Sequence, residues 1–338
     1  MTDKIRKTEE EGATVGRGVI VRRSINTLLC ATLCTAIALF THTLQASSVA
    51  AQARGEAPLV LRLPSSARLA AMANAGIASN DGDALLYNPG MLNGARGMAV
   101  SLQRYGSFGT AGAFGTVTQI GVLNVGVGAQ FLDWTAPTGT AWGDAVRHGA
   151  TRLADSGGVA ASSSAFTFGV ARVIKGVRLG ANLKYAEDRF GAQHDGTFAF
   201  DLGFTMPLGQ ANLAIVAQNL GPGLNIGDVN GRLPRRIGIG YGGGMYPLYE
   251  HFDLGAQMQL TLEGNSFVRP AGGVEVGYVP IEGVAIVVRS GLRLPREKDE
   301  SFVTGGLGLT LDRISIDYAL EPFRGGRPAS HRVGLRIK

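Results

Sequence analysis

The chain has 338 residues, of which 45% are apolar, 17% are charged and 50 are glycine. The apolar share is too high for a low-complexity disordered protein, which lacks the bulky side chains needed to form a core. The formal net charge is +6, and the charged residues are spread along the chain rather than gathered in a basic patch. Composition therefore argues against nucleic acid as a partner.

The first 53 residues have the order of a secretory signal peptide. Arg22 and Arg23 precede an apolar run over 25–40, and small residues lead to Ala51-Gln52-Ala53. The run is shorter than the roughly 20 apolar residues of a membrane-spanning helix. A positive end, a short apolar segment and a small-residue cleavage site predict a cleaved leader over 1–53, with a long region before the apolar run.

The mature chain is therefore expected outside the cytoplasm. Both cysteines, Cys30 and Cys34, lie in the leader, so processing should leave neither a disulfide nor a thiolate metal site. The sequence after residue 53 has no apolar run of 18 or more residues, which argues against membrane-spanning helices. A glycine-rich, apolar, exported chain without long helical patterns favours a β protein.

Apolar and polar residues alternate with period two along much of the mature chain. In 177–188, for example, Leu179 and Leu183 alternate with Asn182 and Lys184. Such alternation marks strands whose two faces meet different environments. The alternating segments run about 10–13 residues, longer than the 5–6 usual in soluble sheets and close to the 9–11 that a bilayer requires.

Two further features favour a membrane barrel over a soluble sandwich or solenoid. The polar faces mix charged residues with glycine, as in a lumen where side chains share space. Aromatic residues gather at the strand ends, where the bilayer interfaces would lie. They are Phe131 and Trp134, Tyr185 and Phe190, Tyr246 and Tyr249, Tyr278, Tyr318 and Phe323.

The alternation predicts fourteen strands, an even number, as single-chain bacterial barrels have. The connections after even-numbered strands are tight, whereas 133–163, 220–234, 295–300 and 323–327 are longer. This arrangement predicts short periplasmic turns, longer external loops and both barrel ends in the periplasm. The predicted strands are 98–105, 111–118, 120–132, 164–173, 176–188, 196–206, 210–219, 235–245, 251–262, 266–278, 283–294, 301–311, 313–322 and 328–338.

Residues 66–92, before the first strand, do not alternate. Asp81 and Asp83 could begin a calcium loop, but the remaining ligand positions are missing. A turn followed by a short helix that ends before Pro89 explains the segment more simply.

Several motifs resemble the PorV/PorQ family and its relatives, the FadL-like transporters of hydrophobic compounds. Ala67-Arg68, Asp83-Ala84 and Tyr87-Asn88-Pro89 match the N-terminal signature of that family. Further likenesses lie in 217–222, 234–238, 317–319 and 331–335, so that the resemblance covers essentially all of 60–338. It implies an all-β, transmembrane antiparallel β-barrel of about 14 strands over 97–338, with residues 54–96 as an N-terminal hatch inside the lumen.

By this resemblance, Tyr87, Asn88 and Pro89, together with Asp83, are candidates for ligand binding and gating in the hatch. The simpler interpretation, which we favour for Asn88-Pro89, is that this pair ends a helix and turns the chain toward the first strand. One departure concerns the C-terminus, because barrels of this kind generally end in an aromatic residue that the insertion machinery reads. This chain ends in Arg336-Ile337-Lys338, although the alternation persists through Ile337.

Charged residues on the predicted inward faces indicate an ion-paired lumen. Paired carboxylates such as Asp253 and Glu263 could serve as acid and base, but interleaved arginines favour ion pairing. The candidates are Asp253, Glu263, Glu275, Arg289, Arg293, Arg313, Asp317, Arg332 and Arg336.

The sequence carries no motif that predicts catalysis. It has no nucleophile elbow, phosphate loop or metal-ligand spacing, so neither an enzyme nor a cofactor is expected. Gly238, Gly240 and Gly243 match a dinucleotide fingerprint, but they lie inside a predicted strand with no helix after it. Glycines that relieve crowding in a bent strand explain them better.

The sequence favours an outer-membrane channel of a diderm bacterium that passes hydrophobic or amphipathic small molecules past the hatch. A second hypothesis is a non-transporting partner or anchor in type IX-like protein secretion, which would use the external loop 133–163. A third is a structural barrel without cargo. Expected partners are outer-membrane lipid, the barrel-assembly machinery, and either hydrophobic small molecules or secretion subunits.

Overall fold

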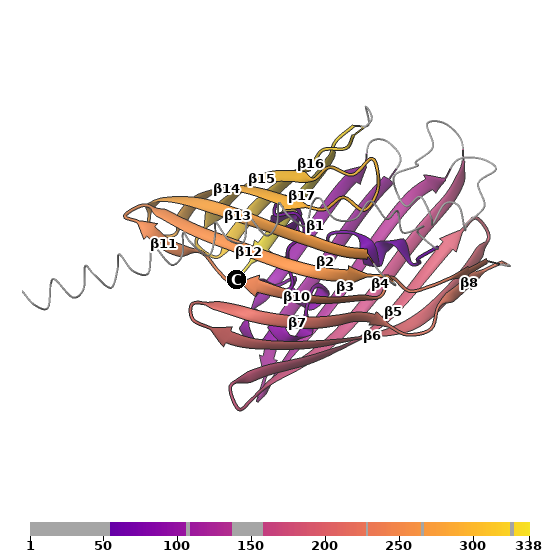
Figure 1. Ribbon diagram of the computed structural model, residues 1–338, viewed down its shortest axis with the longest axis horizontal. Helices are drawn as coiled ribbons and strands as arrows, with labels where there is room; N and C mark the ends of the chain where they lie inside the picture. Colours follow the sequence, from indigo (N-terminus) through magenta and orange to yellow (C-terminus); the bar gives the residue numbers. More distant parts are fainter. Residues whose placement is uncertain (1–54, 106–108, 137–157, 228, 265–266, 325–327) are drawn as a thin grey trace, which may run out of the picture. The chain divides into compact units, whose positions relative to one another are not determined.

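The computed structural model describes residues 55–105, 109–136, 158–227, 229–264, 267–324 and 328–338 (Figure 1). The predicted leader, 1–53, lies outside the described residues. Four short helices come first, and strands follow to the end of the described chain. The helices are η1 (Leu59–Arg62), α2 (Ala67–Ala71), η2 (Ala84–Leu86) and η3 (Pro89–Gly94).

The strands form one antiparallel ring. From β1 to β7, and from β12 to β17, each strand pairs with its neighbour in sequence. Three further pairings close the ring: β1 pairs with β17, and β10 pairs with both β7 and β12. The strands are β1 (Gly97–Tyr105), β2 (Gly109–Ile120), β3 (Leu123–Ala136), β4 (Val159–Ile174), β5 (Val177–Phe190), β6 (Gln193–Leu208), β7 (Ala211–Leu220), β8 (Leu224–Ile226), β9 (Val229–Gly231), β10 (Arg236–Gly242), β11 (Tyr246–Tyr249), β12 (Phe252–Glu263), β13 (Phe267–Ile281), β14 (Val284–Arg293), β15 (Val303–Leu311), β16 (Ile314–Glu321) and β17 (Ser330–Ile337).

Fourteen strands make up the ring, which confirms the predicted number. The other three strands are short. β8 and β9 form a separate hairpin, and β11 pairs with β12 beyond the end of β10. The eighth predicted strand, 235–245, therefore ends early, at Gly242, because Gly243 and Gly244 interrupt it before β11 begins.

The two faces of the strands are as the alternation predicted. In β12, the side chain of Met258 is 41% exposed, whereas its neighbour Gln257 is 3% exposed. The same contrast separates Leu183, which is 42% exposed, from Lys184, which is 2% exposed. Apolar side chains point outward around the ring and polar side chains point inward, as bilayer-spanning strands require.

Tight turns lie at one end of the ring and most of the longer connections at the other. Lys175-Gly176, for example, joins β4 to β5 with both residues at positive φ, +50° and +83°. The start of β1 and the end of β17 lie at this tight-turn end, where Met98 pairs with Ile337. The last strand is therefore paired with β1 as far as Ile337.

The N-terminal segment, residues 55–96, packs against strands around much of the ring. α2 contacts β14 to β17, η1 contacts β3 and β4, η2 contacts β2 to β4, and η3 contacts β3 to β7. Most of its side chains are buried, and η2 ends before Pro89 as predicted. The only β-bridge of this segment within the described chain joins Glu56 to Arg232, so packing and side-chain bonds hold the rest. In the described ranges, every helix is too short or too polar to cross a bilayer.

Candidate functional site

The Asn88-Pro89-Gly90 turn rests on a pair of wall glycines. Gly180 of β5 and Gly203 of β6 lie directly opposite each other in the sheet. A Cβ built on Gly180 would lie 2.2 Å from the Pro89 carbonyl oxygen, and one built on Gly203 would lie 2.1 Å from Oδ1 of Asn88. Only a wall without side chains at these two positions lets the turn approach so closely.

The same relation recurs where the segment meets other strands. Cβ atoms built on Gly273 and Gly291, a cross-strand pair in β13 and β14, would each lie 2.4 Å from an atom of Met72. Cβ atoms built on Gly238 and Gly240 would lie 2.5 and 2.8 Å from side-chain atoms of Ile77. These inward glycines leave room for the segment, which is the physical reason for their place on the polar face.

Tyr87 and Asn88 hold the segment's own loops together. The Tyr87 hydroxyl accepts hydrogen bonds from the backbone N–H groups of Ser65 (3.0 Å) and Ser66 (3.1 Å) and donates to Oδ1 of Asn74 (2.8 Å). Asn88 is fully buried and donates from Nδ2 to the Ile77 carbonyl oxygen at 2.9 Å. Burial raises the pKa of Tyr87, so the phenol remains a neutral donor.

Asp81 and Asp83 are both buried and lie two residues apart, but their environments differ: Asp81 is ion-paired, whereas one oxygen of Asp83 has no hydrogen-bond partner. Asp81 Oδ2 lies 2.7 Å from Nη1 of Arg68 and 2.8 Å from Nη1 of Arg336. Burial, followed by the charge of Asp81, raises the pKa of Asp83 to about 6. Oδ1 of Asp83 is buried without a hydrogen-bond partner.

The calcium interpretation of this pair gains no support. Asp81 is neutralised by Arg68, Arg336 and Lys338. Among the residues that the structure describes, no group of three or more His, Cys, Asp or Glu side chains is placed to hold a metal ion.

Six buried side chains form a closed ring of alternating charge, which we call the latch ring. Two members, Arg68 and Asp81, come from the N-terminal segment, and the other four come from the wall. Arg68 contacts Glu275 (β13), and Glu275 contacts Arg289 (β14) at 3.0 Å. The ring continues from Arg289 to Asp317 (2.7 Å), from Asp317 to Arg336 (2.6 Å), and from Arg336 back to Asp81.

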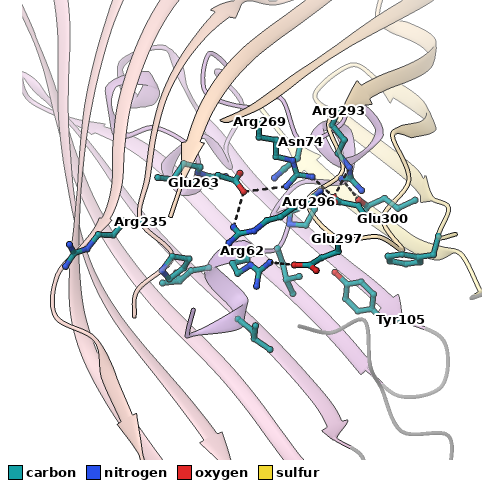
Figure 2. A pocket seen from close by; sticks show the side chains of 18 residues that line it. Arg62, Asn74, Tyr105, Arg235, Glu263, Arg269, Arg293, Arg296, Glu297 and Glu300 are labelled. Carbon is teal, nitrogen blue, oxygen red and sulfur yellow. Dashed lines mark hydrogen bonds and ion pairs between the residues drawn. The ribbon is translucent and has the colours of Figure 1, made fainter. Parts of the chain in front are cut away.

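A second charged cluster lies at the end of the barrel where most of the longer connections are, opposite to the tight turns. A cavity of about 140 Å³ is lined there by η1 and the residues after it, by the ends of several strands and by the loop between β14 and β15 (Figure 2). Six arginines and four glutamates line it, together with apolar side chains such as Leu61 and Phe323. Glu300 lies in this cluster, and its pKa falls to about 2: burial raises it, but the charges of Arg269 and Arg293 outweigh that effect.

Eight of the nine predicted lumen residues lie on the inner side of the ring or at its rim, with three kinds of partner environment. Six of them form buried or half-buried ion pairs: Glu263, Glu275, Arg289, Arg293, Asp317 and Arg336. Arg332 is also buried, but its hydrogen bonds go to the neutral side chains of Gln103 and Ser101. Asp253 is half-buried and forms no ion pair with any described residue.

One predicted lumen residue is misplaced. Arg313 is exposed at the tight turn between β15 and β16, because the strand that it was expected to begin starts one residue later. Sequence reasoning missed other members of the two clusters: Glu56, Arg62 and Arg68 in the N-terminal segment, Arg296 and Glu300 in a loop, and Glu321 at a strand end. Period two marks inward positions only within strands, so it gave no signal for most of these residues.

The comparisons with known proteins show the fold. No protein-family model matches the sequence, and no curated protein matches it. Among solved structures, the Ralstonia pickettii toluene transporter TbuX is similar to this chain with a TM-score of 0.53 and 12% sequence identity, over 82% of this chain and 100% of that one.

Two other solved structures show the same likeness. The Pseudomonas putida toluene transporter TodX matches with a TM-score of 0.50 and 12% identity, over 81% of this chain and 97% of that one. The CymD monoaromatic hydrocarbon channel matches with a TM-score of 0.50 and 11% identity, over 81% and 96%. The chain thus has the barrel fold of proteins that are named hydrocarbon transporters and channels.

Proposed function

We propose that the protein is an outer-membrane channel for hydrophobic or amphipathic small molecules, of the PorV/PorQ and FadL-like type, with residues 54–96 as its hatch. One observation carries the proposal. The ring has an apolar outer face, and apart from the one bridge between Glu56 and Arg232 the described part of the segment inside it is held by close packing, side-chain hydrogen bonds and ion pairs rather than by strand pairing. Such a segment can move without breaking the backbone hydrogen bonds of the wall.

The names of the similar structures support the choice of cargo. TodX and TbuX are named toluene transporters, and CymD is named a monoaromatic hydrocarbon channel. We propose the same broad class of cargo for this chain, and no catalytic role. A bacterial barrel with this outer surface belongs in the outer membrane, reached by export with a cleaved leader and by the barrel-assembly machinery.

The hatch must rearrange for cargo to pass. α2 contacts β14 to β17, whereas η3 contacts β3 to β7, so the segment reaches both sides of the ring. Asp83, Tyr87 and Asn88 lie between these two helices and Pro89 begins η3, and we propose that these four residues transmit the movement. In this proposal Asn88 and Pro89 form the contact with the wall, and Tyr87 joins the loops that must move together.

A disulfide between the hatch and the wall tests whether the hatch moves. The predicted mature chain has no cysteine, so an engineered pair is unambiguous. A Cβ built on Gly334 of β17 lies 2.9 Å from the Cβ of Ala67, and a shift of about 1 Å would bring the pair to disulfide distance. Oxidised Ala67→Cys/Gly334→Cys protein in the outer membrane of intact cells should lower uptake of labelled toluene at least tenfold, and reduction should restore it.

A matched control joins two wall strands and leaves the hatch free. A Cβ built on Gly277 of β13 lies 3.8 Å from the Cβ of Asp253 in β12, which suits a disulfide. Oxidised Asp253→Cys/Gly277→Cys protein should transport at the rate of the unmodified protein. Unchanged uptake through the cross-linked hatch would exclude hatch gating, and uptake no faster than in cells without the protein would exclude the channel.

The alternative is a non-transporting partner or anchor in type IX-like secretion. The latch ring fits this alternative as well, because a partner or anchor that passes no cargo needs no movement of the segment that the ring holds in place. Most of the loop proposed for such partners, 133–163, lies outside the described residues, which resume at residue 158. Purification from detergent-solubilised membranes discriminates, since co-purifying secretion subunits together with absent toluene uptake would support the alternative.

A further inference from the structure

The cavity at the long-loop end combines excess positive charge with an apolar lining. Its cations come from η1, the starts of β10 and β13, the end of β14 and the loop after it (Figure 2). Six arginines face four glutamates across about 140 Å³. A fifth glutamate, Glu56, does not line the cavity but pairs with Arg296. Six arginines and five glutamates leave this cluster with one excess positive charge.

Three of these arginines have close carboxylate partners. Arg293 lies 2.8 Å from Glu321 and 3.0 Å from Glu300. Arg296 lies 2.7 Å from Glu56, and Arg269 contacts Glu300. These three arginines already have close anionic partners, so we do not expect them to bind a further anion.

Arg62 differs from them. Its shortest distances to carboxylate oxygens are 3.5 Å, from Nη2 to Glu297, and 3.9 Å, from Nε to Glu56. Its Nη1 is buried and has no hydrogen-bond partner. Burial, followed by the charge of Arg296, lowers the pKa of Arg62, so the existing glutamates do not fully stabilise its charge.

Among the described residues, the hydrogen bonds of two more lining arginines go to neutral oxygen atoms. Arg235 donates to the Gly221 carbonyl oxygen at 2.7 Å, and Arg236 donates to Oε1 of Gln218 at 2.8 Å. With Arg62, whose carboxylate contacts are 3.5 and 3.9 Å long, they give the cavity three guanidinium groups that lack a close anionic partner among the described residues. A planar anion with two oxygen atoms is the natural partner of such groups.

The apolar lining suits the rest of a small ligand. Leu59, Leu61 and Leu63 come from η1 and its C-terminal neighbour, and Phe323 and Pro234 complete the apolar surface. An engineered protein cavity of about 150 Å³ accommodates benzene, so a single aromatic ring fits this space.

We propose that this cavity binds small amphipathic carboxylates of about the size of an aromatic acid, with the carboxylate on Arg62 and the ring against the η1 leucines. The inference deepens the proposed function and rests on it for what happens after binding. A neutral hydrocarbon would fill the apolar part but would leave the Arg62 N–H group without a partner. The cavity therefore selects the acid over the hydrocarbon of the same shape.

Calorimetric titration of the processed, detergent-solubilised protein at neutral pH tests the site, with benzoate as the probe and benzyl alcohol as its neutral counterpart. Benzoate should bind at one site, at least tenfold more tightly than benzyl alcohol. Arg62→Gln should weaken benzoate binding at least tenfold and leave benzyl alcohol unchanged, whereas Arg62→Lys, which keeps the charge, should weaken benzoate less. Arg313→Gln, at the opposite end, should bind benzoate as the unmodified protein does.

Folding of each variant is checked by its circular dichroism and its heat-dependent gel mobility. If Arg62→Gln does not fold, Arg235→Gln at the exposed edge of the cavity replaces it, with at least a threefold loss expected. Equal affinity for benzoate and benzyl alcohol, or equal benzoate binding by the unmodified protein and the folded arginine variant, would overturn the inference. Toluene uptake without benzoate binding would overturn this inference alone, and benzoate binding without any uptake would overturn the channel alone.

Discussion

Arg336, two residues before the end of the chain, places its Nη1 2.8 Å from Oδ2 of Asp81 in the N-terminal segment. Through this pair the last strand of the wall holds the segment inside it. The pair also closes the latch ring, in which Arg68 contacts both Asp81 and Glu275. Each carboxylate of the ring contacts two arginines, so none of these six buried charges lacks a partner of opposite sign.

The latch ring predicts the effect of removing one carboxylate. Asp81→Asn leaves the three arginines of the latch ring with only two carboxylates, Glu275 and Asp317, so one buried positive charge is uncompensated. Removing one partner of a buried ion pair costs about 3–5 kcal/mol, because the remaining charge is uncompensated. We expect a loss of that size in the free energy of unfolding, measured with urea in phospholipid vesicles.

Asp312→Asn provides the control for that measurement. Asp312 is exposed at the turn between β15 and β16 at a φ of +52°, a conformation that asparagine tolerates. The control should retain the stability of the unmodified protein. Equal stability of both variants would show that the latch ring does not hold the segment.

The paired wall glycines predict a steric effect. An alanine at Gly203 would place its Cβ 2.4 Å from the backbone nitrogen of Gly90, so the Asn88-Pro89-Gly90 turn must leave the wall. Overpacking of this kind costs about 1–3 kcal/mol. Gly203→Ala should increase hydrogen exchange of backbone amides in 84–94.

A second alanine tests whether any glycine replacement has this effect. The nearest atom to a Cβ built on Gly272 is the Gln257 carbonyl oxygen at 3.3 Å, and no atom of the N-terminal segment is among its close contacts. Gly272→Ala should therefore leave exchange in 84–94 unchanged. If both variants raised exchange equally, the close approach of turn and wall would not be the cause.

The two faces of β12 predict opposite tolerance to charge. Met258, near the middle of the strand, points outward, whereas Gln257 points inward. Met258→Arg should lower the free energy of unfolding in phospholipid by about 2–4 kcal/mol, the cost of an arginine facing lipid near the bilayer midplane. Met258→Leu should cost less than about 1.5 kcal/mol. Similar stability of the arginine and leucine variants would show that this face does not meet lipid.

Asp83 predicts a pH dependence in the mildly acidic range. Burial raises its pKa from 3.8 to about 6, so the folded protein binds a proton at a pH where the unfolded chain has lost it. The stabilisation is complete below the unfolded pKa and is lost as pH rises through about 6. A shift of about two units corresponds to about 3 kcal/mol.

Comparison with Asp83→Asn isolates this group from the others that titrate, because Asp81, Arg68 and Arg336 face the same position in both proteins. Unfolding free energies at pH 4 and pH 7.5 should fall more steeply for the unmodified protein than for the variant, which cannot ionise there. Parallel profiles would show that Asp83 does not retain its proton in the folded state.

The sequence predicted the wall well because the relevant signal is local. Leu183 and Lys184, or Met258 and Gln257, are neighbours whose opposite chemistry places them on opposite faces of the strand. Strand eight was predicted three residues too long, since apolar residues continue past the glycine pair that interrupts it. Arg313 was misplaced for a similar reason, because a strand boundary that shifts by one residue moves a side chain from the lumen to a turn.

The sequence by itself determined the strand number, the outward face and the position of the tight turns, because period-two alternation and turn residues act over a few neighbours. Only the tertiary structure decided which charges meet. Arg68 and Glu275 are separated by 207 residues, and Arg62 and Glu297 by 235. Ring closure brings such residues together, and packing of the N-terminal segment selects which wall positions must be glycine, so neither relationship leaves a local pattern in the sequence.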